Sequence, residues 1–193
     1  MEQNIRELFS NKEYKGMLGG IVEVDEMYAV RDTTKKTKRG RGTNKCKIFG
    51  MRERNSEENK IGEFRIKVVS ATNSRTLHPI IFENVEAGSW LMSDDYKAYR
   101  NLEEFYVRGV SNHSKRHYAD GEVHINSVEG SWSHLRRLIN GIHHRPSKKH
   151  LQKYLDEFEF RYNHRDKSLN LIFKAAIKQS KVRKTHAELT RKQ

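Results

Sequence analysis

Three acidic residues lie in segments whose patterns would place them on rigid elements. Asp25 follows the alternating run Ile21–Val24, Asp94 follows the apolar run Trp90–Ser93, and Glu129 lies in a segment with helical periodicity. Phosphodiester cleavage without a covalent intermediate needs an activated water or hydroxyl, and two divalent cations about 4 Å apart can stabilise the attacking and leaving oxygens. Clustered carboxylates suit Mg²⁺ or Mn²⁺, whereas zinc prefers His or Cys ligands. The three acids therefore permit metal-dependent phosphodiester chemistry.

The two aspartates also have structural alternatives. Asp25 could be a solvent-facing strand residue, in which case Glu23 or Glu26 could be the functional acid. Asp94, or Asp95 beside it, could cap a helix that begins directly afterwards. A single aspartate at a strand end is structural more often than catalytic, so the catalytic interpretation depends on all three acids together.

The segment that carries Glu129 has the strongest helical pattern in the sequence. Apolar residues recur there at three- and four-residue steps and form one stripe, made of Ile125, Val128, Trp132, Leu135, Ile139 and Ile142. One flank of this stripe carries Glu129, Ser133, Arg136 and Asn140. A carboxylate and a cation would thus lie along one groove. The structural alternative is a capping box, with Asn126 as the N-cap and Glu129 three residues later.

The remaining patterns predict an α/β chain. Alternating or apolar runs predict five strands, at residues 21–25, 47–53, 63–69, 90–93 and 105–110. Helical patterns occupy residues 74–84, with an interruption near Pro79, residues 96–104, and the chain from residue 125 onward. This order predicts a mixed five-stranded sheet flanked by helices, in which an antiparallel meander is followed by βαβ units.

Five segments resemble the motifs of a known family and occur in the same order. They are Val22–Glu26, Ser93–Tyr99, Val110–Ser114, His124–Ser133 and Lys149–Asn163. Together they resemble the ISXO-type (ISXO2-like) transposases of bacterial insertion sequences, which are DDE enzymes related to eukaryotic Merlin elements. The resemblance spans roughly residues 19–165, and its last two motifs are long enough to be specific.

The resemblance implies an RNase H-like fold and a metal-binding acidic triad that maps onto Asp25, Asp94 and Glu129. Some relatives have Asn as the third residue, so Asn126 is a rival or supporting ligand. Arg136 lies where such enzymes often carry a cation near the DNA phosphate.

The sequence departs from the family pattern in three places. Residues 27–31 lack the two glycines that usually follow the first motif, and Asp95 replaces a common Gly. Members usually carry an N-terminal zinc-ribbon or helix-turn-helix module, whereas here only 18 residues precede the Gly19-Gly20 break before the first predicted strand. The chain therefore resembles the catalytic domain alone, as in a truncated or decayed copy.

The composition predicts an intracellular protein with a polyanionic partner. The 193 residues carry a formal net charge of +13 and the sequence pI is near 9.8, for which nucleic acid is the commonest partner. The single cysteine, Cys46, excludes a disulfide framework and a cysteine-rich zinc site. No apolar run approaches the roughly 20 residues of a membrane span, and the first 18 residues are too polar for a signal peptide. We expect a cytoplasmic, nucleoid-associated protein, or a nuclear one if the source is eukaryotic.

Two basic segments are candidates for DNA contact. Residues 31–47 carry eight basic residues against one acid, and residues 130–150 contain no acid. Either segment could be merely solvated, but phosphate contacts of this kind would give affinity without sequence selectivity. The candidate DNA-binding residues are Lys35, Lys36, Lys38, Arg39, Arg41, Arg137, Arg145, Lys148 and Lys149.

These observations predict a DNA transposase catalytic domain at residues 19–165, with an extension at residues 1–18 and a C-terminal helix and basic tail at residues 166–193. Two Mg²⁺ or Mn²⁺ ions would support cleavage of the element end and strand transfer. Because both DNA ends must be held together, we expect a homodimer or a larger assembly on DNA. The alternatives are a catalytically inactive DNA-binding remnant and a structure-selective nuclease that performs no strand transfer.

Overall fold

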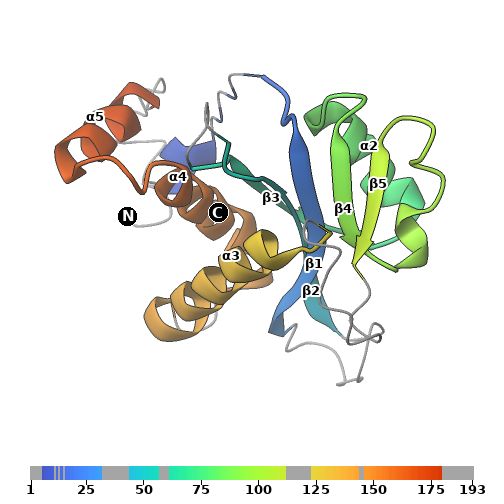
Figure 1. The fold of residues 1–193 in the computed structure, drawn as a ribbon. Helices are drawn as coiled ribbons and strands as arrows, with labels where there is room; N and C mark the ends of the chain where they lie inside the picture. The colour runs from blue at the N-terminus through green and yellow to red at the C-terminus, as the bar shows by residue number, and fades with distance from the viewer. Residues whose placement is uncertain are drawn as a thin grey trace.

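The computed structural model describes residues 6–10, 12, 14, 16–31, 44–56, 61–111, 123–143 and 146–179 (Figure 1). The strands are β1 (Ile21–Arg31), β2 (Lys45–Glu53), β3 (Phe64–Val69), β4 (Trp90–Asp94) and β5 (Val107–Ser111). The α-helices are α2 (Ser74–Asn84), α3 (Asn126–Arg137), α4 (Leu151–Asn163) and α5 (Leu169–Gln179). Short helical segments are η1 (Glu7–Ser10), η3 (Lys97–Tyr99), η4 (Leu138–Ile142) and η5 (Lys148–His150).

The five strands form one mixed sheet in the order β3-β2-β1-β4-β5. Strand β2 runs antiparallel to both of its neighbours, while β1, β4 and β5 are parallel to one another. The predicted α/β fold with a mixed five-stranded sheet is confirmed, and this strand order is that of the predicted RNase H-like fold. No helix in the described part of the chain is long and apolar enough to cross a membrane.

Alternation along β1 divides the core into two layers. Val22 and Val24 face one side of the sheet and pack with α2, whereas Met27 faces the other side and packs with α3 and α4 (Figure 1). Glu23 and Asp25 share the parity of Met27, so both carboxylates point toward the layer that holds α3.

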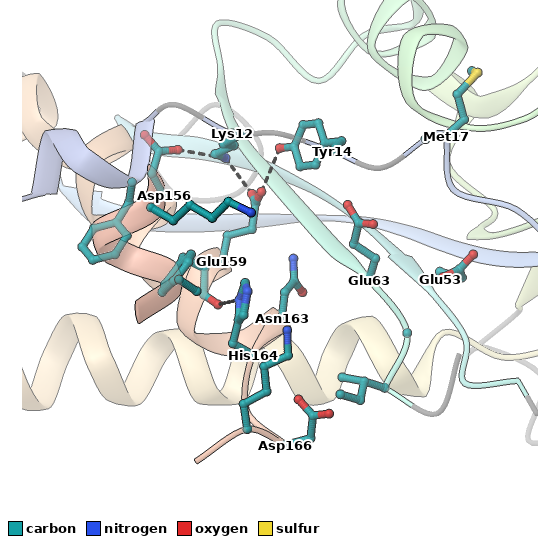
Figure 2. Close-up of a pocket in the computed structure, with 18 of the residues that line it drawn as sticks. Lys12, Tyr14, Met17, Glu53, Glu63, Asp156, Glu159, Asn163, His164 and Asp166 are labelled. Carbon is teal, nitrogen blue, oxygen red and sulfur yellow. Dashed lines mark hydrogen bonds and ion pairs between the residues drawn. The ribbon is translucent and has the colours of Figure 1, made fainter. Parts of the chain in front are cut away.

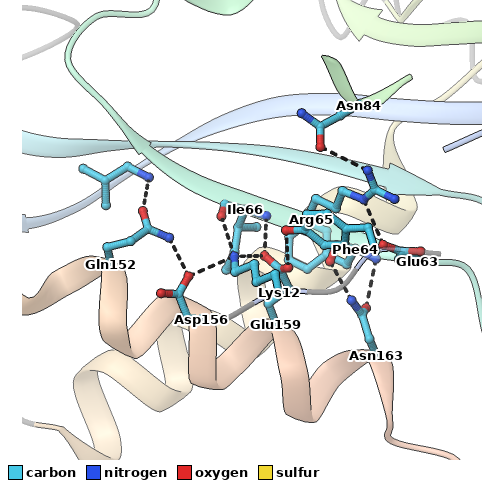
Figure 3. A network of polar contacts seen from close by, with 12 residues as sticks. Lys12, Glu63, Phe64, Arg65, Ile66, Asn84, Gln152, Asp156, Glu159 and Asn163 are labelled. Atoms are coloured by element: carbon cyan, nitrogen blue, oxygen red, sulfur yellow. Dashed lines mark hydrogen bonds and ion pairs between the residues drawn. The ribbon is translucent and has the colours of Figure 1, made fainter. Parts of the chain in front are cut away.

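Helix α4 covers the edge strand β3. The outward N–H groups of Phe64, Ile66 and Val68 donate hydrogen bonds of 2.8–2.9 Å to side chains of α4, and these acceptors are Asn163, Glu159 and Gln152 (Figure 3). An uncovered strand edge would leave such groups available for pairing with another chain. Side chains of α4 thus take the place of a further strand.

The segment before β1 packs against the same helix. Lys12 Nζ lies 2.7 Å from Glu159 Oε2 and 2.9 Å from Asp156 Oδ1, and the Tyr14 hydroxyl donates to Glu159 Oε1 at 2.8 Å (Figure 2). Burial raises the pKa of Glu159, while the Lys12 charge opposes that rise. Lys12 thus stabilises the buried carboxylate that also binds the edge of β3.

Two predicted helices differ from the structure. Residues 96–104 were expected to be helical, but they form only the 3₁₀ turn Lys97–Tyr99 followed by turns. Asn101 has φ of 67°, in the left-handed region, which ends any helix at that point. The predicted interruption near Pro79 is also wrong, because α2 continues through Pro79 with buried residues on both sides of it.

The apolar stripe of the Glu129 segment is confirmed except at its end. Its first five members are buried, whereas the side chain of Ile142 is 66% exposed. Residues 138–142 form a π-helix, in which the N–H of His143 bonds the carbonyl of Leu138 at 3.1 Å. Because a π-turn contains an extra residue, it rotates the following side chains away from the stripe.

Candidate catalytic site

Parallel pairing brings Asp25 and Asp94 to the same end of the sheet. Strands β1 and β4 pair from Ile21 with Trp90 to Glu23 with Met92, and the same register places Asp25 level with Asp94. Adjacent strands lie roughly 4.8 Å apart, and residues at equal register point to the same face. Pairing between β1 and β4 ends at Glu23, two residues before Asp25. The two aspartates therefore lie just beyond the paired part of β1 and β4.

Glu129 reaches this end from the first turn of α3. The helix begins beside β1 because the N–H of Val128 donates to Glu23 Oε2 at 2.9 Å. Glu23 is fully buried, and its other oxygen pairs with Arg54 Nε at 2.6 Å. Glu23, one of the two alternative functional acids, thus anchors the N-terminus of α3, which positions Glu129.

The charges of the three acids interact. Burial, with smaller contributions from the charges of Asp94 and Glu129, raises the pKa of Asp25 to about 6 from its usual 3.8. Hydrogen bonds from the Glu26 backbone and the Trp132 indole oppose this rise. Asp94 and Glu129 thus lie within electrostatic range of Asp25. Among the residues that the structure describes, however, no three His, Cys, Asp or Glu side chains are grouped closely enough to hold a metal ion.

Trp132 positions the Asp25 carboxylate. Its indole Nε1 donates to Asp25 Oδ2 at 2.9 Å, and its ring is only 2% exposed. The ring lies over Gly50, the β2 partner of Asp25, where an added Cβ would fall 2.4 Å from Trp132 Cη2. A glycine within a strand often marks such a close approach, so Gly50 was the sequence signal that our prediction missed.

Residues 17–163 match the ISXO2-like transposase domain family, which covers more than half of the chain. The chain belongs to this family. The predicted resemblance to ISXO2-like transposases is thereby confirmed.

Two curated relatives and one solved structure are similar to this transposase domain. An uncharacterized transposase-like protein of Haemophilus influenzae is 36% identical over 118 residues, which are 60% of this chain and 94% of the relative. An uncharacterized protein in the transposable element ISH50 of Halobacterium salinarum is 29% identical over 160 residues, and the match spans 75% of this chain but only 52% of that protein. A chain of the simian T-cell lymphotropic virus intasome in complex with PP2A regulatory subunit B56 gamma matches with a TM-score of 0.40 and 12% identity over 75% of this chain and 50% of its own length.

The structure supports a structural role for Asp94 but contradicts the capping role suggested for Glu129. Asp94 Oδ1 accepts a hydrogen bond from the N–H of Tyr96 at 3.0 Å, so this side chain does stabilise the turn after β4. The capping box at Glu129 is wrong, because α3 begins with Ile125 as its N-cap and has no side-chain capping bond. Asn126 is exposed in the first turn of α3, near Glu129 in sequence.

The described basic candidates are on the surface. Arg136, two turns beyond Glu129 on α3, is exposed, as are Arg137, Lys148 and Lys149. Arg137 Nη2 contacts His134 Nδ1 at 3.1 Å. The other candidates lie outside the described residues, and they are Lys35, Lys36, Lys38, Arg39, Arg41 and Arg145.

A cavity of about 860 Å³ lies away from the three acids. The segment before β1, the end of β2, α4 and α5 line it, and its polar residues include Glu53, Glu63 and Asp166 (Figure 2). None of the three candidate catalytic acids contributes to its walls.

Proposed function

We propose that this ISXO2-like transposase domain cleaves DNA and transfers the cut strand, with divalent cations held by Asp25, Asp94 and Glu129. The observation that supports this proposal most is that the partly buried Asp25 lies within range of the charges of Asp94 and Glu129. Burial, with smaller contributions from these two charges, raises the pKa of Asp25 to about 6. Carboxylates that repel one another in a partly buried site bind a cation with a gain in electrostatic energy.

The donor chemistry fits Mg²⁺ or Mn²⁺, since all three side chains offer hard oxygen ligands from two strands and a helix. Two such ions would activate the attacking oxygen and neutralise the leaving one. Asp25 and Asp94 would hold cation between them and Glu129 would complete the second position, with Asn126 in support. Arg136 would bind the phosphate next to the reacting bond.

DNA binding is the second part of the proposal. The net charge of +13 and the exposed cations on α3 and η5 favour phosphate contacts. Since the freed 3′ hydroxyl must reach target DNA while both ends are held, a homodimer or larger assembly on the DNA ends is part of the proposed function.

The substitution Asp94→Asn tests the proposal. We expect this variant to lose Mg²⁺-dependent nicking of a DNA substrate while it still retards DNA on a gel, because the change removes one charged ligand and leaves the basic surface intact. Asp95→Asn is the matched control, since Asp95 is the exposed neighbouring acid in the same motif. Equal nicking by wild type and Asp94→Asn would refute the assignment.

The wild-type protein separates the alternatives in the same assay. DNA retention without nicking, with or without EDTA, would identify an inactive DNA-binding remnant. Nicking without joined products would identify a nuclease instead of a transposase.

A further inference from the structure

The ladder between β1 and β4 ends before it reaches Asp25 and Asp94, so it does not by itself set the separation of these two residues. The pairing of β4 with β5 continues to Asp94, whereas its pairing with β1 ends at Met92. Beyond Met92, ladder hydrogen bonds no longer fix the distance between the strands that carry the two aspartates. Other contacts must fix it.

One contact that can fix this distance lies on the face of the sheet opposite to the two aspartates. The Tyr99 hydroxyl, from η3 beyond β4, donates to Glu26 Oε1 on β1 at 2.6 Å. Tyr99 is fully buried in the core layer beneath α2. Deep burial, followed by the charge of Glu26, raises the pKa of Tyr99 well above its usual value, so the phenol remains a donor. The charges of Asp25 and Asp94 also act on this phenol, which therefore lies within electrostatic range of both aspartates.

Arg108 connects Tyr99 to β5 and β4. Its carbonyl accepts a hydrogen bond from Arg108 Nη1 on β5 at 2.7 Å. Arg108 Nη2 donates to Ser93 Oγ on β4 at 3.0 Å, directly before Asp94. A continuous set of contacts therefore runs from β5 and β4 through Tyr99 to Glu26 on β1.

We propose that Tyr99 is a positioning residue, whose hydrogen bond to Glu26 holds β1 and β4 at the separation that lets Asp25 and Asp94 share a divalent cation. This inference rests on the proposed function. Tyr99 faces away from the acids and does not touch the cation, so its effect passes through the strand that carries Asp25.

Mg²⁺ titration of Tyr99→Phe tests this role without an activity assay. The chain has two tryptophans, and the other one, Trp90, is 50% exposed, so a Trp90→Phe background leaves Trp132 beside Asp25 as the reporter. Because partners outside the ligand set typically change metal affinity 10–100-fold, we expect Tyr99→Phe to raise the half-saturating Mg²⁺ concentration by at least about tenfold.

Tyr106→Phe is the matched control. Tyr106 is a buried tyrosine of the same core layer, and its hydroxyl donates to the carbonyl of Val85 at 3.1 Å, away from the acids. We expect its half-saturating Mg²⁺ concentration to equal that of the Trp90→Phe parent. If Tyr99→Phe does not fold, Ser93→Ala carries the test, since it removes an Arg108 acceptor and should shift the titration in the same direction.

The outcomes separate the two proposals. A parent that binds Mg²⁺ with Asp25-dependent fluorescence, and a Tyr99→Phe variant with the same half-saturation, would overturn the positioning role and leave the proposed function intact. An equal shift in Tyr106→Phe would also overturn it, because any lost core hydroxyl would then have the same effect. A parent without a saturable response would overturn the cation site, and the positioning role with it.

Discussion

Gly50→Ala should lower the free energy of unfolding by about 3 kcal/mol, at the upper end of overpacking costs. The added Cβ would lie 2.4 and 2.5 Å from two atoms of the Trp132 ring and 3.1 Å from Phe64 Cε2. The ring is buried beneath α3 and cannot move without breaking its hydrogen bond to Asp25. For a domain of this size, the cost corresponds to a fall in Tm of roughly 6–12 °C, which calorimetry can measure together with the fluorescence of Trp132.

Gly130→Ala is the control for this substitution. Gly130 is an exposed position within α3, and an added Cβ there meets no atom within 4 Å. Because alanine favours a helix by about 1 kcal/mol over glycine, this variant should be as stable as wild type or more so. An unchanged Tm for Gly50→Ala would show that Trp132 does not lie on β2 as described.

The five strands were predictable because they depend on local alternation. The same alternation, a two-residue periodicity in Ile21–Asp25, places Asp25 on the opposite face of its strand from Val22 and Val24. Asp25 and Asp94 lie at the same end of the sheet because their strands run parallel to each other. The assignment of the triad came from the family resemblance, and its catalytic role stays a prediction.

Contacts between distant segments account for what the sequence did not predict. The residues around Tyr99 have helical composition, but Arg108 binds the carbonyl of Tyr99 and the chain turns at Asn101 with a positive φ. Tertiary contacts override helix propensity in this way. The packing of Trp132 over Gly50 could not be predicted from the sequence either, because it joins a helix to a strand that is distant in the sequence.

Asp25→Asn should make the cation-free protein more stable at pH 8 by up to about 3 kcal/mol. The pKa of Asp25 is raised to about 6 from 3.8, mainly by burial, so the folded state favours the protonated acid. Below about pH 4 this contribution is fully present, and it is lost as pH rises through 6, at about 1.4 kcal/mol per pH unit between the two values. An asparagine is neutral throughout and keeps an oxygen that can accept from Trp132.

Urea unfolding in EDTA at pH 4 and pH 8 measures this difference. We expect wild type and Asp25→Asn to have similar stability at pH 4 and to separate at pH 8, whereas Asp95→Asn, at an exposed acid, should follow wild type at both. Added Mg²⁺ at pH 8 should then stabilise wild type more than Asp25→Asn, since binding to the folded state alone adds to stability. A variant less stable than wild type at pH 8 in EDTA would show that the Asp25 carboxylate contributes to folding. A cation site that holds repelling acids together should lower the stability of the cation-free protein, and that destabilisation would then be absent.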